Sequence, residues 1–144
     1  MVAQAEALLL DTHAAIWFVA GLLDSITAEA IIAAGVSARV YVSPVSAWEI
    51  GLLARPKISG EPRLTFEPSA QSWFDALLAK PIIREAPFTA RIAISSSFLP
   101  GSFHDDPADR MLVATARDMN VPIVTRDRRI LAYGVAGHVR TLAC

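Results

Sequence analysis

Four acidic residues in this 144-residue chain stand where an α/β fold could bring them together. Asp11 and Asp127 each follow a short apolar run, whereas Glu49 and Asp109 lie on segments with helical periodicity. In an open parallel sheet, ligands bind outside the carboxyl ends of the strands. We therefore expect the four carboxylates, which come from distant parts of the sequence, to meet at one edge of a sheet.

The spacing of apolar residues sharpens this expectation for two of the acids. Glu49 and Asp109 each share a helix face with apolar side chains, because residues three and four apart lie on one face. These apolar stripes are Val45, Trp48, Leu52 and Leu53 in the first helix, and Leu112, Val113 and Ala116 in the second. An inward carboxylate is costly without a cationic partner or a metal. No inward lysine or arginine on these two helices offers itself as that partner.

A cluster of carboxylates predicts a site for a hard divalent cation. Neighbouring carboxylates raise one another's pKa, and a bound cation relieves their repulsion. Mg²⁺ prefers oxygen ligands and keeps several waters, so that few carboxylates per ion suffice. Such a site can activate water and stabilise the charge on a phosphodiester. The absence of a cysteine or histidine cluster in the sequence argues against a structural zinc site.

Several arginines flank two of these acids in the sequence. They could hold RNA phosphates, or they could form an ordinary solvated face. Arg110 could also pair with a neighbouring acid. The four residues are Arg110, Arg126, Arg128 and Arg129.

Structural alternatives exist for most of the acids. Glu49 could close a capping box with Ser46, and Asp109 could stabilise the positive end of its helix. Asp127 could cap the helix that follows it, which does not exclude a metal role. Asp11 has no obvious structural task at the end of a buried strand.

Other polar and aromatic residues are given structural roles. Asp106 is expected to cap the helix that begins at Pro107. His13 and His104 are expected to serve packing or hydrogen bonding rather than to bind a ligand. Three tryptophans are assigned to the core, namely Trp17, Trp48 and Trp73.

Short strands alternate with helices along the whole chain. The expected strands are Ala7–Leu10, Arg39–Val42, Ile82–Ala86, Pro122–Thr125 and Val139–Leu142. The expected helices are Ala14–Ala20, Ser25 or Thr27 to Ala34, Pro44–Ala54, Ser69–Leu78, Thr89–Phe98, Pro107–Met119 and Arg128–Tyr133. This alternation predicts an α/β fold with a mainly parallel sheet. Residues 1–144 are expected to form a single domain.

The composition indicates a compact globular protein, because 53% of residues are hydrophobic and only 19% are charged. The net charge is −1, so attraction to nucleic acid would have to come from a local patch or a bound metal. Cys144 is the one cysteine, so no internal disulfide can form and a reducing cytoplasm is the expected setting.

The apolar stretch from Ala5 to Leu23 is expected to be a buried strand and helix rather than a targeting or membrane segment. It carries none of the positive charge that begins a signal peptide. A membrane span would place Asp11 near the bilayer centre, at a cost of about 2.5–3.5 kcal/mol.

Four segments of the chain resemble successive blocks of the VapC-type toxins of the PIN-domain family. They are LLLDTHAAIWF, VSPVSAWEIGLL, HDDPADRMLVATARDMNVPIVTRD and VRTL, in that order. The third segment, His104 to Asp127, is the most specific of them. The stretch from Lys57 to Pro68 matches no block, so its role is open.

This resemblance implies a three-layer α/β/α sandwich and RNA cleavage that depends on Mg²⁺ or Mn²⁺. The family's acids correspond to Asp11, Glu49, Asp109 and Asp127, with Asp11 and Asp109 as the principal metal ligands. The resemblance also implies a homodimer and inhibition by a cognate antitoxin protein.

Two other classes of function fit the sequence less well. A haloacid-dehalogenase-type phosphatase would require an aspartate where His13 stands, and a receiver domain would require paired acids near its first strand and a lysine after a late strand. The sequence has neither pattern. A binding module without catalysis is disfavoured by the intact set of acids.

Overall fold

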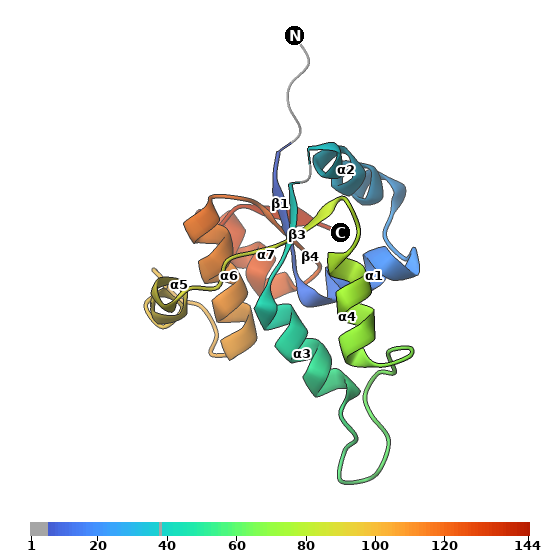
Figure 1. Ribbon diagram of the computed structural model, residues 1–144. Helices are drawn as coiled ribbons and strands as arrows, with labels where there is room; N and C mark the ends of the chain where they lie inside the picture. Colours follow the sequence, from blue (N-terminus) through green and yellow to red (C-terminus); the bar gives the residue numbers. More distant parts are fainter. Residues whose placement is uncertain (1–5, 38) are drawn as a thin grey trace.

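The computed structural model describes residues 6–37 and 39–144 of the chain. Within them, five parallel strands form one sheet in the order β3-β2-β1-β4-β5 (Figure 1). The strands are β1 (Leu8–Leu10), β2 (Val40–Val42), β3 (Ile83–Glu85), β4 (Ile123–Thr125) and β5 (Thr141–Ala143). The expected parallel sheet is therefore confirmed.

The central strand β1 is the point at which the strand order reverses. Leu9 is in register with Tyr41 of β2 on one side and with Ile123 of β4 on the other. The chain builds the sheet outward from β1 through β2 and β3, then returns to the other side of β1 for β4 and β5. Such a reversal opens a crevice at the carboxyl ends of the two central strands, which is where Asp11 and Asp127 follow β1 and β4.

Seven helices are seen in the described residues, and they cover both faces of the sheet (Figure 1). Their bounds are α1 (Thr12–Ala20), α2 (Ser25–Val36), α3 (Pro44–Ala54), α4 (Ala70–Leu78), α5 (Ala90–Ser95), α6 (Pro107–Met119) and α7 (Arg128–Val135). Helices α1, α2 and α4 pack on one face, α6 and α7 pack on the other, and α5 contacts α6. This arrangement is the expected α/β/α sandwich.

A hydrophobic core lies on each face of the sheet, and strand β1 contributes to both. Leu8 and Leu10 belong to the core on the α1 side, and Leu9 belongs to the core on the α6 side. A strand that is buried on both faces must be apolar at every position rather than at alternate ones. The sequence LLL meets that requirement.

The expected elements are all present, with shifted boundaries. Helix α1 begins at Thr12 rather than at Ala14, because Asp11 caps it. Helix α5 ends at Ser95 rather than at Phe98, where the Ser95 and Ser96 hydroxyls donate to helix carbonyl oxygens and compete with the helix ladder. The last strand occupies Thr141–Ala143, which is later than expected.

The placement of Trp48 in the core was wrong. Its side chain is 48% exposed, because the buried positions of α3 are Val45, Ser46 and Ile50. Trp17 and Trp73 are half-buried, and Trp73 packs edge-on against Phe66 with ring centroids 5.2 Å apart.

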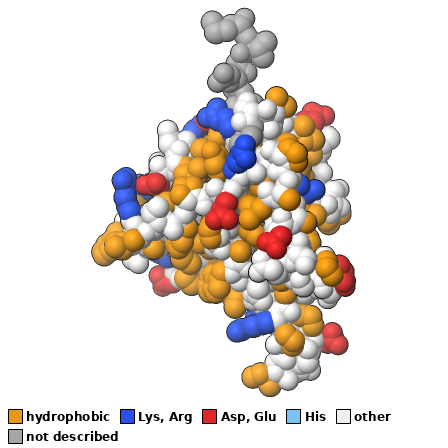
Figure 2. All heavy atoms as spheres, viewed as in Figure 1, with side chains coloured by type: hydrophobic (Ala, Val, Ile, Leu, Met, Phe, Trp, Pro, Cys, Tyr) orange, Lys and Arg blue, Asp and Glu red, His pale blue; other side chains and the backbone are white. Residues whose placement is uncertain are grey.

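The connection from α3 to α4 extends outward from the body of the protein (Figure 1). Its two arms are joined by an isolated antiparallel bridge between Pro56 and Pro62. Ile58, in this connection, is fully exposed, and Ile94 and Phe98 at α5 are also exposed. Figure 2 shows hydrophobic side chains at the end of this connection and over α5. In the described residues, no single helix is long and apolar enough to span a membrane. Helices α1 and α2 reach that length and hydropathy only together, and they are bent by 99° relative to one another.

Candidate active site

All four expected carboxylates line one pocket of about 310 Å³ at the carboxyl ends of β1 and β4. Asp11 and Asp127 come from the strand ends, and Glu49 and Asp109 come from α3 and α6. The other lining residues are Thr12, His13, Trp17, Leu112 and Arg126. Four separate segments of the chain therefore supply acidic side chains to one cavity.

Asp11 has a structural task that the sequence analysis did not find. Its Oδ1 accepts the backbone N–H of Ala14 at 2.7 Å, so that it caps α1. Burial raises the pKa of Asp11, while the Thr125 hydroxyl and the Ala14 N–H act in the opposite direction. Because the cap fixes one oxygen of a carboxylate that is only 8% exposed, its orientation toward the pocket is set by the fold.

Glu49 is held by the first residue of α1. The Thr12 hydroxyl donates to Oε1 of Glu49 and shares a second hydrogen bond, 2.9 Å long, with the Ser46 hydroxyl. The capping-box alternative was wrong, because Ser43 caps α3 through the Val45 N–H. Burial raises the pKa of Glu49, and the Thr12 hydrogen bond opposes that rise.

Asp109 lies in the first turn of α6, three residues after the capping residue Asp106. Its backbone N–H donates to Oδ1 of Asp106 at 2.9 Å, which confirms Asp106 as the capping residue. Burial, followed by the charges of Asp106, Asp127 and Glu49, raises the pKa of Asp109 to about 7, although Arg129 opposes the rise. Asp109 is thus the carboxylate most affected by its acidic neighbours.

Asp127 caps α7, as the structural alternative for this residue stated. Its Oδ1 accepts the backbone N–H groups of Arg129 and Ile130 at 2.8 and 3.2 Å. Partial burial raises the pKa of Asp127, but the Arg129 side chain and these two N–H groups outweigh that effect and leave it lowered. The pocket therefore combines one readily ionised carboxylate with three whose ionisation is disfavoured.

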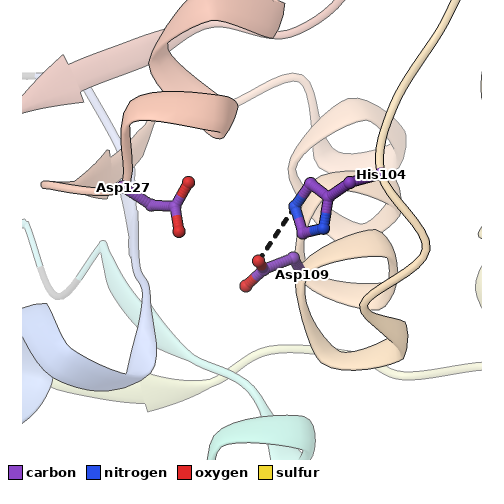
Figure 3. A group of neighbouring side chains, drawn as sticks. All are labelled: His104, Asp109 and Asp127. Atoms are coloured by element: carbon purple, nitrogen blue, oxygen red, sulfur yellow. Dashed lines mark ion pairs between the residues drawn. The ribbon is translucent and has the colours of Figure 1, made fainter.

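The cationic or potentially cationic side chains that contact Asp109 come from outside α3 and α6. Nε2 of His104 and Nη2 of Arg129 lie 3.0 and 3.6 Å from Oδ2 of Asp109. Figure 3 shows the Asp109 and Asp127 carboxylates pointing toward one another, with the His104 ring on the far side of Asp109. His104, Asp109 and Asp127 each offer one ligand atom within 4.8 Å of the others, and Asp11 and Glu49 lie outside this tighter set.

Two of the four arginines lie at the pocket, and one has another task. The Arg126 guanidinium sits 4.0 Å from the centroid of the Trp17 ring. Arg129 pairs with Asp127 at 3.2 Å. Arg128 is exposed. Arg110 differs from the expectation, because it neither lines the pocket nor pairs with an acid.

The guanidinium of Arg110 instead fixes a loop. It donates to the backbone oxygens of Ser96, Phe103 and His104 at 2.8, 3.0 and 3.2 Å. Three carbonyl acceptors for one partly buried guanidinium are typical of a structural contact rather than of a free phosphate ligand. The loop that leads into α6 is thereby tied to the helix that follows it.

The chemistry of the pocket suits a hard divalent cation. Its acidic groups are oxygen donors from Asp11, Glu49, Asp109 and Asp127, which are the ligands that Mg²⁺ and Mn²⁺ accept. Burial and mutual repulsion raise the pKa of three of them. A cation in the pocket would offset both effects.

Sequence reasoning missed two residues of this site. Thr12 contacts Glu49, and its position directly after Asp11, at the start of a helix, was the available signal. His104 contacts Asp109; a packing or hydrogen-bonding role was expected for it, but not Asp109 as its partner. No local signal indicated this contact, since His104 lies in a loop whose path depends on Arg110.

A family model and a known ribonuclease match most of the chain. A family model described as PIN domain matches residues 8–136. The chain is 32% identical over 127 residues to Ribonuclease VapC22 of Mycobacterium tuberculosis (strain ATCC 25618 / H37Rv), which covers 87% of this chain and 90% of that protein.

Solved structures share the fold. DNA-bound VapBC from Salmonella typhimurium gives a TM-score of 0.63 at 13% identity, covering 96% of this chain and 98% of that one. VapBC2 from Rickettsia felis, bound to a promoter DNA fragment, gives 0.62 at 15% identity, covering 95% and 98%. FitAcB from Neisseria gonorrhoeae gives 0.54 at 18% identity, covering 94% and 96%. At these identities the likeness concerns the fold.

Proposed function

This chain belongs to the PIN domain family, and from that premise we propose that it cleaves RNA with the help of a divalent cation held in its acidic pocket. It is a toxin ribonuclease of a toxin–antitoxin system, as the family match and the relative named Ribonuclease VapC22 support. The finer assignments below concern the metal, the residues and the partners.

The divalent cation is Mg²⁺ or Mn²⁺, and the four carboxylates of the pocket hold it. Asp11 and Asp109 are the principal ligands, and Glu49 and Asp127 act as direct or water-mediated ones. A divalent cation at such a site supplies charge stabilisation to the phosphodiester and activates water. Support comes from the single pocket that the four side chains line and from the raised pKa of three of them.

The protein's own residues orient the carboxylates. The Ala14 N–H fixes Asp11, the Thr12 hydroxyl fixes Glu49, and the first N–H groups of α7 fix Asp127. Such hydrogen bonds hold a site close to its working geometry before the substrate arrives.

The RNA backbone is bound by arginines at the rim of the pocket. Arg126, Arg128 and Arg129 follow β4 and surround Asp127, whereas the Arg110 guanidinium is already engaged by the loop before α6. Guanidinium groups bind phosphate through paired hydrogen bonds. The proposed partners are the RNA substrate, a cognate antitoxin protein and a second copy of the chain in a homodimer.

The observation that carries this proposal is the convergence of four carboxylates from four segments on one pocket. The test measures cleavage of single-stranded RNA with Mg²⁺ or Mn²⁺ by the wild-type protein and by Asp11→Asn. Asparagine caps helices as well as aspartate does, so the variant keeps the cap of α1 and removes only the charge. We expect the variant to lose at least about 100-fold in rate, in line with the effect of losing a key electrostatic group. Equal cleavage by both proteins would reject the assignment.

A further inference from the structure

His104 lies against Asp109 at the edge of the acidic pocket, although it is not one of the four carboxylates. Its Nε2 atom is 3.0 Å from Oδ2 of Asp109. The same nitrogen is buried and lacks a well-aligned hydrogen bond within the described part of the chain. Because a buried N–H is costly to leave unpaired, the adjacent Asp109 oxygen is the acceptor that this nitrogen needs.

The other ring nitrogen determines where the proton of His104 resides. The backbone N–H of Asp106 donates to Nδ1 of His104 at 3.3 Å. A neutral imidazole whose Nδ1 accepts a hydrogen bond carries its proton on Nε2. The N–H of Nε2 then faces Asp109, and Nε2 has no lone pair to offer a metal ion. The geometry therefore favours a hydrogen-bond donor over an additional metal ligand.

The His104 ring is fixed by its surroundings. It packs on Phe103 with ring centroids 4.4 Å apart, and Phe103 packs on Tyr133 at 4.7 Å. Arg110 donates to the backbone oxygens of Phe103 and His104. One helix, α6, thus carries both Asp109 and the arginine that anchors the segment in contact with Asp109.

We propose that His104 is a positioning residue for Asp109, whose Nε2–H binds Oδ2 and so directs Oδ1 to the divalent cation. Arg129 also approaches Oδ2, at 3.6 Å, so the donors gather on one oxygen of the carboxylate. The inference rests on the proposed function, because the orientation of Asp109 matters only if this residue holds a metal ion. Groups that orient metal ligands typically change metal affinity by about 10–100-fold.

The test compares His104→Ala with His104→Gln in the whole chain. The amide of glutamine can place an N–H donor near the position of Nε2, but it offers no imidazole nitrogen as a metal ligand. The measurements are the dissociation constant for Mn²⁺ alone, by calorimetry, and the melting temperature of the metal-free protein. We expect His104→Ala to raise the dissociation constant at least about tenfold, and His104→Gln to stay within about threefold of wild type.

A matched control separates positioning from loosening of the loop. His138 also packs on Tyr133, at 4.8 Å between ring centroids, and lies close to Gly101 of the same loop. It does not reach Asp109. We expect His138→Ala to lower the melting temperature while the Mn²⁺ dissociation constant stays within about twofold of wild type, because the contact with the metal ligand is intact.

Three outcomes would overturn the inference: wild-type Mn²⁺ affinity in His104→Ala, an equal loss in His104→Gln, or an equal loss in His138→Ala. The second would indicate that the imidazole itself ligates the metal. Asp109→Asn distinguishes the two levels of the argument. If this variant binds Mn²⁺ as wild type does, the proposed metal site fails; if it binds poorly while His104→Ala binds normally, only the role of His104 fails.

Discussion

At the scale of single residues, two of the four carboxylates serve the fold and the site at once. Asp11 and Asp127 cap α1 and α7 with Oδ1, while Oδ2 of Asp127 accepts a hydrogen bond from the Arg129 guanidinium. Helix N-termini carry a partial positive charge that stabilises nearby anions. The caps thereby reduce the cost of concentrating negative charge in one place.

Asp109 also lies in a first helical turn, but burial and the neighbouring acids outweigh that benefit, so its charge should destabilise the metal-free protein. Folding raises its pKa from 3.8 to about 7. A carboxyl whose pKa is raised by folding costs no stability below its unfolded pKa, costs progressively more as pH rises from about 4 to 7, and costs its full amount above that range. Without metal, Asp109→Asn should be more stable than wild type at pH 8, by on the order of 1–2 kcal/mol once solvent screening is allowed for.

Chemical denaturation at pH 4.5 and pH 8 in the presence of a chelator measures this effect. The gain from Asp109→Asn should shrink toward pH 4.5, where Asp109 of the native protein is protonated. Asp75→Asn is a suitable comparison, because Asp75 is exposed on α4, away from the acidic pocket. A gain that is independent of pH would contradict the explanation from ionisation.

At the scale of elements, the Thr12 hydroxyl joins α1 to α3. It contacts both Glu49 and Ser46, and Thr12 and Ser46 are buried. Thr12→Val keeps the shape but leaves two polar groups with one partner fewer. We expect the free energy of unfolding to fall by about 1–3 kcal/mol. Thr12→Ser keeps the hydroxyl and should cost less, so an equal loss in both variants would attribute the effect to the methyl group.

The elements themselves could be predicted from the sequence because their signals are local. Continuous apolar runs give strands that are buried on both faces, and Ser43-Pro44 and Asp106-Pro107 mark the starts of α3 and α6. Asp11 and Asp127 follow the carboxyl ends of β1 and β4. Because the two strands are parallel neighbours, these ends lie at the same edge of the sheet.

What could not be predicted depends on contacts between distant segments. Trp48 has an apolar side chain in the expected apolar stripe of its helix, yet it is exposed, because α3 buries other positions. Arg110 was considered for a phosphate contact, a solvated face or an ion pair, but its acceptors are carbonyl groups of a loop whose course the sequence does not reveal. The contact of His104 with Asp109 depends on that same loop.

At the scale of the whole molecule, the reversal of strand order at β1 produces the pocket, and a cation in it should stabilise the entire fold. A ligand that binds only the native state adds RT ln(1 + [L]/Kd) to the free energy of unfolding, or about 2.7 kcal/mol at 100 times Kd. We expect Mn²⁺ to raise the melting temperature of the wild-type protein and EDTA to reverse the rise. Asp109→Asn should show little of this stabilisation, and an equal rise in both proteins would place the metal elsewhere.

The net charge of −1 makes RNA binding a local property of the surface. Arg128 is exposed and directly follows Asp127, which lines the pocket. Arg39 is exposed at the amino end of β2, on the opposite edge of the sheet. Arg128→Ala and Arg39→Ala change the net charge equally, so the two variants differ only in where the charge is lost. In the Asp11→Asn background, which should keep the RNA intact, Arg128→Ala should reduce the slope of log affinity against log salt by about 0.7, the value for one phosphate contact on a single strand.

Fluorescence anisotropy across a series of salt concentrations measures that slope for single-stranded RNA. Arg39→Ala should leave it unchanged, because a charge beyond about one Debye length, roughly 8–10 Å at moderate salt, contributes little to the pocket. Equal reductions in the two variants would mean that RNA responds to overall charge, and the arginines around Asp127 would then lose their proposed role. A reduction in Arg128→Ala alone would place one phosphate of the bound RNA beside the end of β4, next to the carboxylates proposed to hold the cation.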